Sequence, residues 1–145
     1  MLPFRGDAHI AAGRTQLVTS DNLFIKTLDK SGNVLFSQTI DGPGGFWEEP
    51  GLGVPGPTNV QDTEVHYDIS TGRFWIVAMP AVFSNQYFPS FFVAYSLNPN
   101  DGTSWKKFRL QVPIMPGFDP PNLSFFFIDS VNIAIDTQDV WLSGL

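Results

Sequence analysis

The segment that decides the fold is Glu64-Val65-His66-Tyr67-Asp68, followed after a short turn by Gly72-Arg73-Phe74-Trp75-Ile76-Val77. An alternating strand, a turn that contains Asp and a second apolar strand are typical of a β-hairpin. Two further segments can be laid over this hairpin, Gln16–Ile25 and Asn132–Leu142. A hairpin unit that recurs along one chain favours a repeat architecture of short antiparallel strands.

Outside this hairpin, alternation and turn residues predict a series of short strands and no helix. Twelve Pro and thirteen Gly among 145 residues leave little room for long helices. We therefore expect an all-β chain. The expected strands are Gln16–Ser20, Leu23–Leu28, Val34–Thr39, Thr63–Tyr67, Phe74–Met79, Phe92–Leu97, Trp105–Val112, Asn132–Ile135 and Val140–Ser143.

Composition narrows the classes of partner. Apolar residues make up 43% of the chain and charged residues 15%, so it has the composition of a folded domain. The net charge of −6 argues against nucleic acid and against anionic membrane surfaces. The longest apolar run, Phe74–Phe83, is too short to cross a bilayer and contains Pro80. We expect neither nucleic-acid binding nor membrane insertion.

Several short motifs follow one another in a recognisable order. They are Asn22-Leu23-Phe24-Ile25, Asp29-Lys30-Ser31-Gly32, Phe46-Trp47, Asp62-Thr63-Glu64-Val65-His66-Tyr67-Asp68 with Gly72-Arg73-Phe74, and Val93-Ala94-Tyr95-Ser96. This order resembles the opening blades of large bacterial extracellular β-propeller proteins. The resemblance covers roughly Gly13 to Leu145 and rests on order and spacing; Thr63 departs from it, because the family usually has Pro there.

A second motif, Asn98-Pro99-Asn100-Asp101-Gly102-Thr103-Ser104-Trp105, resembles a degenerate Asp box, the S-x-D-x-G-x-T-W turn of sialidase-like propellers. We expect Asn98, Asn100, Gly102 and Trp105 to build a structural turn. Its polar side chains would bond the turn backbone, Gly102 would adopt a positive φ, and Trp105 would fill the space between blade sheets. Asp boxes are structural, so the motif implies no glycosidase activity.

The resemblance implies a partial β-propeller with about two antiparallel four-stranded blades and the first hairpin of a third; a self-contained β-sandwich is the alternative. We expect one all-β unit over 1–145. It divides into an N-terminal arm (1–14), a first blade with a long loop (15–61), a second blade with its loop (62–123) and the start of a third blade (124–145). Because propellers close with at least four blades, the chain would be a fragment or part of an assembly.

The candidate binding residues lie in the Gly/Pro-rich connections, where aromatic and carboxylate side chains could meet a glycan or a protein. They are Trp47, Glu48, Glu49, Tyr87 and Phe88. The alternative is that the two glutamates are solvated loop charges and that the aromatic residues pack in the interior. The catalytic residues stay unknown: a retaining glycosidase needs two carboxyls about 5 Å apart, and the sequence shows no convergent set.

Metal and cofactor sites are not expected. His9 and His66 lack the H-x-x-x-H or H-x-H spacing of a zinc site. The stretch Asn98–Gly102 lacks the ligands of an EF-hand loop, and a structural calcium ion there is left open. Without Cys, the chain has no disulfides, zinc-thiolate sites or iron–sulfur clusters.

The leading function is a non-catalytic extracellular or cell-surface module that binds protein or glycan or acts as a scaffold. No signal peptide is recognisable in this chain. Part of a sialidase-like glycoside hydrolase and a structural subunit of a larger assembly are the alternatives. The strand Val140-Trp141-Leu142 carries no charge or Pro to protect an edge, so we expect self-association or a protein partner there.

Overall fold

The computed structural model describes residues 8–21, 23–40, 42–48, 60–80, 90–111, 132–135 and 139–143, and these residues form strands and turns without a helix. The prediction of an all-β chain is confirmed. In the part of the chain described, no helix is long and apolar enough to cross a membrane. The strands are β1 (His9–Ala12), β2 (Gln16–Ser20), β3 (Phe24–Asp29), β4 (Val34–Thr39), β5 (Val60–Asp68), β6 (Arg73–Pro80), β7 (Ser90–Ser96), β8 (Trp105–Gln111), β9 (Asn132–Ile135) and β10 (Val140–Ser143).

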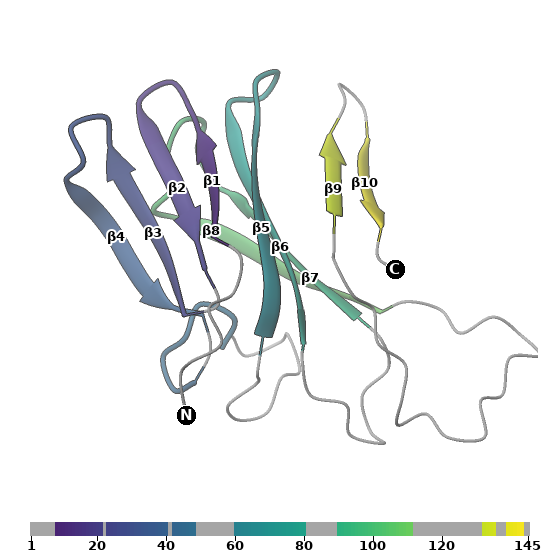
Figure 1. The fold of residues 1–145 in the computed structure, drawn as a ribbon. Helices are drawn as coiled ribbons and strands as arrows, with labels where there is room; N and C mark the ends of the chain where they lie inside the picture. Colours follow the sequence, from purple (N-terminus) through teal and green to yellow (C-terminus); the bar gives the residue numbers. More distant parts are fainter. Residues whose placement is uncertain are drawn as a thin grey trace, which may run out of the picture.

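These strands form three antiparallel sheets in sequence order (Figure 1). The first sheet is β1-β2-β3-β4, the second is β5-β6-β7-β8, and the third is the hairpin β9-β10. Each four-stranded sheet is a simple meander, so every strand pairs with its neighbour in sequence. The prediction of two antiparallel four-stranded sheets and one further hairpin is confirmed.

The first sheet begins earlier than the sequence suggested. Strand β1 lies within the segment that was expected to be an N-terminal arm, and it pairs with β2 from His9↔Ser20 to Ala12↔Leu17. The first hairpin of the first sheet is therefore β1–β2. The sequence comparison laid Gln16–Ile25, which belongs to β2–β3, over β5–β6 and β9–β10. Because those two are the first hairpins of their sheets and β2–β3 is a second hairpin, this superposition was wrong by one strand.

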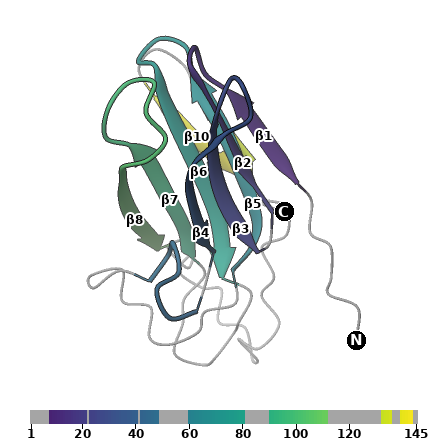
Figure 2. The same ribbon diagram turned by 90° about the vertical axis from the view of Figure 1, so that its left-hand side faces the viewer.

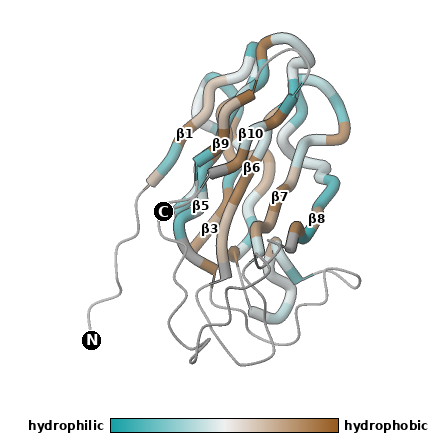
Figure 3. Tube along the Cα trace, turned by 90° about the vertical axis from the view of Figure 1, so that its right-hand side faces the viewer, coloured by the Kyte–Doolittle hydropathy of each residue, from teal (hydrophilic) through white to brown (hydrophobic). Residues whose placement is uncertain are grey.

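The second sheet is the middle layer. On one face, its residues Phe74, Ile76 and Phe92 join a core cluster with Val18 and Ile25 of the first sheet. On the other face, Val77, Met79 and Val93 contact Ile133 of the third sheet. Because side chains alternate along a strand, β6 and β7 supply apolar residues to both layers, and apolar colouring is prominent on β7 (Figure 3).

The first two sheets come closest at their first strands. The nearest approaches between the two sheets are those of β1 and β2 to β5 (Figure 2). Strand β9 of the third sheet also lies near β5. Toward β4 and β8, the space between the sheets holds the segment 42–48. Its Trp47 ring stacks on Phe92 at 5.4 Å between centroids, and Phe46 meets Trp105 edge-on at 5.6 Å. The sheets therefore diverge outward, and this aromatic pair fills the wedge.

Candidate functional site

Three turns meet at one end of the sheets, and Asn100 lies at their centre. Its side-chain oxygen accepts a 2.6 Å hydrogen bond from the Tyr67 hydroxyl. Its backbone N–H donates to the Gly72 carbonyl at 2.7 Å, and its own carbonyl accepts from the Thr15 hydroxyl at 3.2 Å. Asn100 thus connects the β1–β2, β5–β6 and β7–β8 turns. We call this arrangement the turn junction.

The expected structural turn lies within this junction, with one correction. Gly102 does not have a positive φ; Asn100 has one, of 57°. Glycine is required at 102 for space, because a Cβ there would approach the Val18 methyl to 2.6 Å. The indole of Trp105 donates to the Gly102 carbonyl at 3.1 Å and packs, half-buried, against the core between the first two sheets. Asn98 lies exposed at the start of the turn and donates to Asp101 at 3.4 Å.

Two aspartates fix the local shape of these turns. Asp68 accepts hydrogen bonds from the Ser70 amide at 2.8 Å and from the Thr71 hydroxyl. Burial raises the pKa of Asp68, but the bonds from Thr71 and Ser70 outweigh it, so the pKa lies below the ordinary value of 3.8. The pKa of Asp101 is lowered in the same way, with burial opposed by Thr103.

Beside the junction, an open cavity of about 530 Å³ lies where β1 and β5, the first strands of the first two sheets, approach each other. We call this side of the two sheets the inner edge. Its lining is Ile10, Ala11, Ala12, Gly13, Arg14, His66, Tyr67 and Ile69. The β1–β2 turn is pressed against β5 here, because a Cβ on Gly13 would come within 2.5 Å of the Phe74 ring and 3.0 Å of the Tyr67 ring. Close packing at Gly13 thus positions Arg14 at the rim of the cavity.

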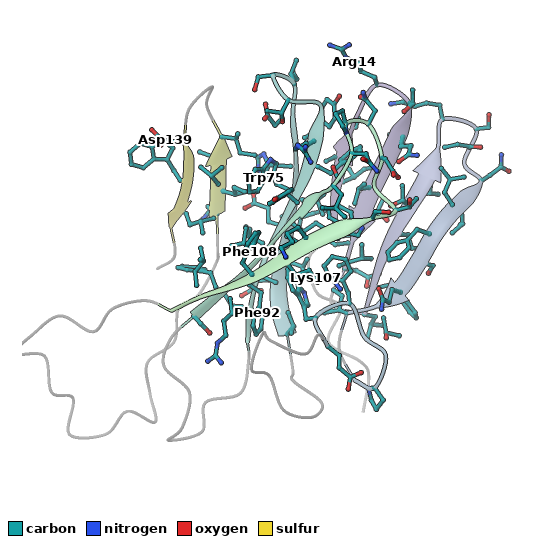
Figure 4. All side chains as sticks on the ribbon, turned by 180° about the vertical axis from the view of Figure 1, so that it is seen from behind. Arg14, Trp75, Phe92, Lys107, Phe108 and Asp139 are labelled. Atoms are coloured by element: carbon teal, nitrogen blue, oxygen red, sulfur yellow. The ribbon has the colours of Figure 1, made fainter. Side chains whose placement is uncertain are left out.

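The polar side of the cavity carries a histidine and an arginine. His66 Nε2 lies 3.2 Å from Glu64 Oε1, and the other oxygen of Glu64 accepts a 3.0 Å hydrogen bond from the backbone N–H of Ile133. The imidazole is therefore oriented by a carboxylate that is itself tied to the third sheet. Arg14 projects from the tip of the β1–β2 turn into solvent, and it pairs with no other described residue (Figure 4).

Of the five binding residues expected from the sequence, the structure describes Trp47 and Glu48, and these two side chains lie in different surroundings. Trp47 is 1% exposed and lies in the core against Phe92, so it offers no face to a ligand in this structure. Glu48 is exposed, and its carboxylate accepts a hydrogen bond from the Gly44 amide of its own loop. Glu49, Tyr87 and Phe88 lie outside the described residues.

Sequence reasoning missed the cavity. From the sequence, Arg14 has no assigned role, and His66 is considered only as a zinc ligand that lacks a partner at the required spacing. The available signal was Gly13-Arg14-Thr15 between two strand-like runs, which is a tight turn, but that required β1 to be recognised. Among the residues that the structure describes, no group of three or more His, Cys, Asp or Glu could hold a metal ion.

In comparisons with known proteins, the chain matches no protein-family model, no curated protein and no solved structure.

Proposed function

We propose that the chain is a binding module of β-propeller type, in which the first two sheets are consecutive blades and the β9–β10 hairpin begins another. Three features support this. Each four-stranded sheet runs strand by strand from an inner to an outer edge. The first strands of successive sheets approach one another at the inner edge. The Thr15–Asn100 bond of the turn junction and the neighbouring Gln16–Gly102 bond join the first two sheets.

The observation that carries the binding function is the cavity between β1 and β5. Its volume of about 530 Å³ is within the range of ligand sites. Apolar side chains from β1 and from the β5–β6 turn meet an arginine and a carboxylate-oriented histidine there. Apolar walls with a few convergent polar groups are typical of sites that recognise a ligand.

The partner is a protein or a glycan, and the module acts outside the cell or at its surface. This placement rests on the motif resemblance. The outermost strand of the third sheet supports a protein partner as well, since Trp141 of β10 is 62% exposed and the strand carries no charge. The chemistry of the lining favours binding over hydrolysis. A retaining glycosidase needs two carboxyl groups about 5 Å apart, and Glu64 is the carboxylate that adjoins His66 here. The Tyr67 hydroxyl is already bonded to Asn100.

One preparation of the protein can test this. It would be applied to a glycan array and to a peptide array, and incubated with aryl glycosides to detect turnover. We expect binding on one of the arrays and no release of the aryl group. Turnover that disappears in Glu64→Gln would contradict the proposal, and so would the absence of binding on both arrays.

A further inference from the structure

We propose that the cavity at the inner edge binds an extended peptide by adding it to the edge of β1 that pairs with no described strand, with a peptide carboxylate held by Arg14. This inference rests on the proposed binding function and specifies its partner. It combines a strand edge, a cation that pairs with no described residue and an apolar wall, all of which border the same cavity.

The strand edge comes first. Strand β1 pairs with β2 on one side, and no described strand pairs with its other edge. Five consecutive residues, Ile10 to Arg14, line the cavity, so the cavity follows the backbone of β1 into the turn. The backbone N–H and C=O groups of a strand edge can pair with an added strand, which gives affinity without a specific side-chain sequence. The occupant that fits such an edge is an extended peptide.

Charge selects among extended peptides. The Arg14 guanidinium forms no ion pair with another described residue, and a guanidinium recognises carboxylates through two parallel hydrogen bonds. His66 lines the same cavity, but its Nε2 is directed at Glu64, which leaves Arg14 as the cation of the lining that can meet a peptide carboxylate. An acidic side chain or a C-terminal carboxylate near one end of the peptide therefore fits this rim.

Apolar contacts complete the site. Ile10 is 64% exposed and Ile69 is 76% exposed, and both line the cavity. Two exposed isoleucines beside one strand edge leave apolar surface that a bound side chain would cover. The proposed ligand consequently has an apolar residue next to its carboxylate.

The test is a double-mutant cycle with synthetic peptides. Probes are acetylated five-residue peptides with varied apolar residues and one Asp, each matched by a peptide with Asn at that position. A third set is methylated on alternate backbone nitrogens. The protein variants are Arg14→Gln and, as a control for a remote surface cation, Lys30→Gln in the β3–β4 turn. Binding is measured by fluorescence anisotropy at low and high salt.

We expect wild-type protein to bind the best Asp peptides about tenfold more tightly than their Asn partners, as for a charge-assisted hydrogen bond. Arg14→Gln should abolish this ratio, and Lys30→Gln should keep it. Methylation of the nitrogens that face β1 should abolish binding. Equal affinity for Asp and Asn peptides, an unchanged ratio in Arg14→Gln or tolerance of every methylation would overturn the inference.

The proposed function and the inference fail separately. Binding on a glycan array with no peptide bound leaves the module a binding protein and overturns the peptide site. Absence of both kinds of binding overturns both. Because Arg14 is exposed and projects from a turn, its substitution should leave thermal unfolding unchanged, and this control separates lost recognition from lost folding.

Discussion

The two faces of the second sheet are covered in different ways. Toward the first sheet, a large core includes Phe74, Ile76 and Phe92. At one end of this core, the Thr15 hydroxyl bonds the Asn100 carbonyl and Gln16 bonds the Gly102 amide, so hydrogen bonds cross between the two sheets. Toward the third sheet, four buried residues form a smaller cluster, and the Glu64 carboxylate reaches across to the Ile133 amide.

The two contacts differ in the hydrogen bonds that accompany the apolar packing: several cross from the first sheet to the second, and the bond from the Ile133 amide to Glu64 joins the third sheet to the second. Apolar contact alone is not directional, so it resists separation more than sliding. The Thr15 hydroxyl donates to the Asn100 carbonyl and the Gln16 side-chain oxygen accepts from the Gly102 N–H, and these bonds to the β7–β8 turn fix the register of the first sheet on the second. The first two sheets should therefore unfold as one unit, whereas the third sheet should open at lower cost.

The largest expected effect comes from a matched pair of isoleucines, one in each contact. Ile76 is fully buried between the first two sheets, and Ile133 is 5% exposed in the third. We expect Ile76→Ala to cost about 4 kcal/mol and Ile133→Ala about 2 kcal/mol, because a two-stranded sheet can shift to close the cavity that is left. Urea unfolding measures both. Equal losses would show that the two contacts are equally rigid.

A smaller effect is expected at Gly102. A Cβ there would overlap the Val18 methyl, so Gly102→Ala should cost about 2 kcal/mol by forcing the turn away from the first sheet. In a Val18→Ala background the same substitution should cost clearly less, since the blocking methyl is gone. The control is Gly32→Ala, which meets no atom within 4 Å and tests only the strain of its φ of +90°. Additive losses for positions 18 and 102 would contradict the steric explanation.

The smallest effect is the pH dependence from Asp68. Its pKa is lower in the folded chain than the ordinary 3.8, so its stabilising contribution is present above that value and is lost as the pH falls through the folded pKa. We expect the free energy of unfolding to decrease below about pH 4. Asp68→Asn should make this decrease shallower. An unchanged pH profile in the variant would mean that the Thr71 and Ser70 bonds contribute nothing.

Much of the sheet structure was predictable because turn residues bound the apolar runs. The limits of β2, β4, β9 and β10 follow from the residues alone, since each lies between clear turn residues. Strand β1 has four residues, as β9 and β10 have, but it was missed because two of its residues are alanines, which carry little hydrophobic pattern. That one omission also shifted the proposed hairpin repeat.

The site was much less predictable. Trp47 follows a Gly/Pro-rich stretch, which normally indicates an exposed loop, yet it fills the wedge between diverging sheets. Only the three-dimensional packing creates that wedge. The cavity has the same origin, because Arg14 and His66 become neighbours through the approach of β1 to β5, which no local pattern encodes.

The first two sheets diverge from a shared inner edge. Distances between a spin label on the first sheet and one on the second sheet test this divergence. The chain has no Cys, so two introduced cysteines are its only labelling sites. In the first sheet, a row of paired residues runs across the four strands from Ala12 on β1 to Val34 on β4. The corresponding row in the second sheet runs from His66 on β5 to Lys106 on β8. We expect the outer pair, Val34 and Lys106, to give a clearly longer distance than the inner pair, Ala12 and His66. Equal distances would indicate two sheets at constant separation, as in a sandwich, and would contradict the divergence of the sheets.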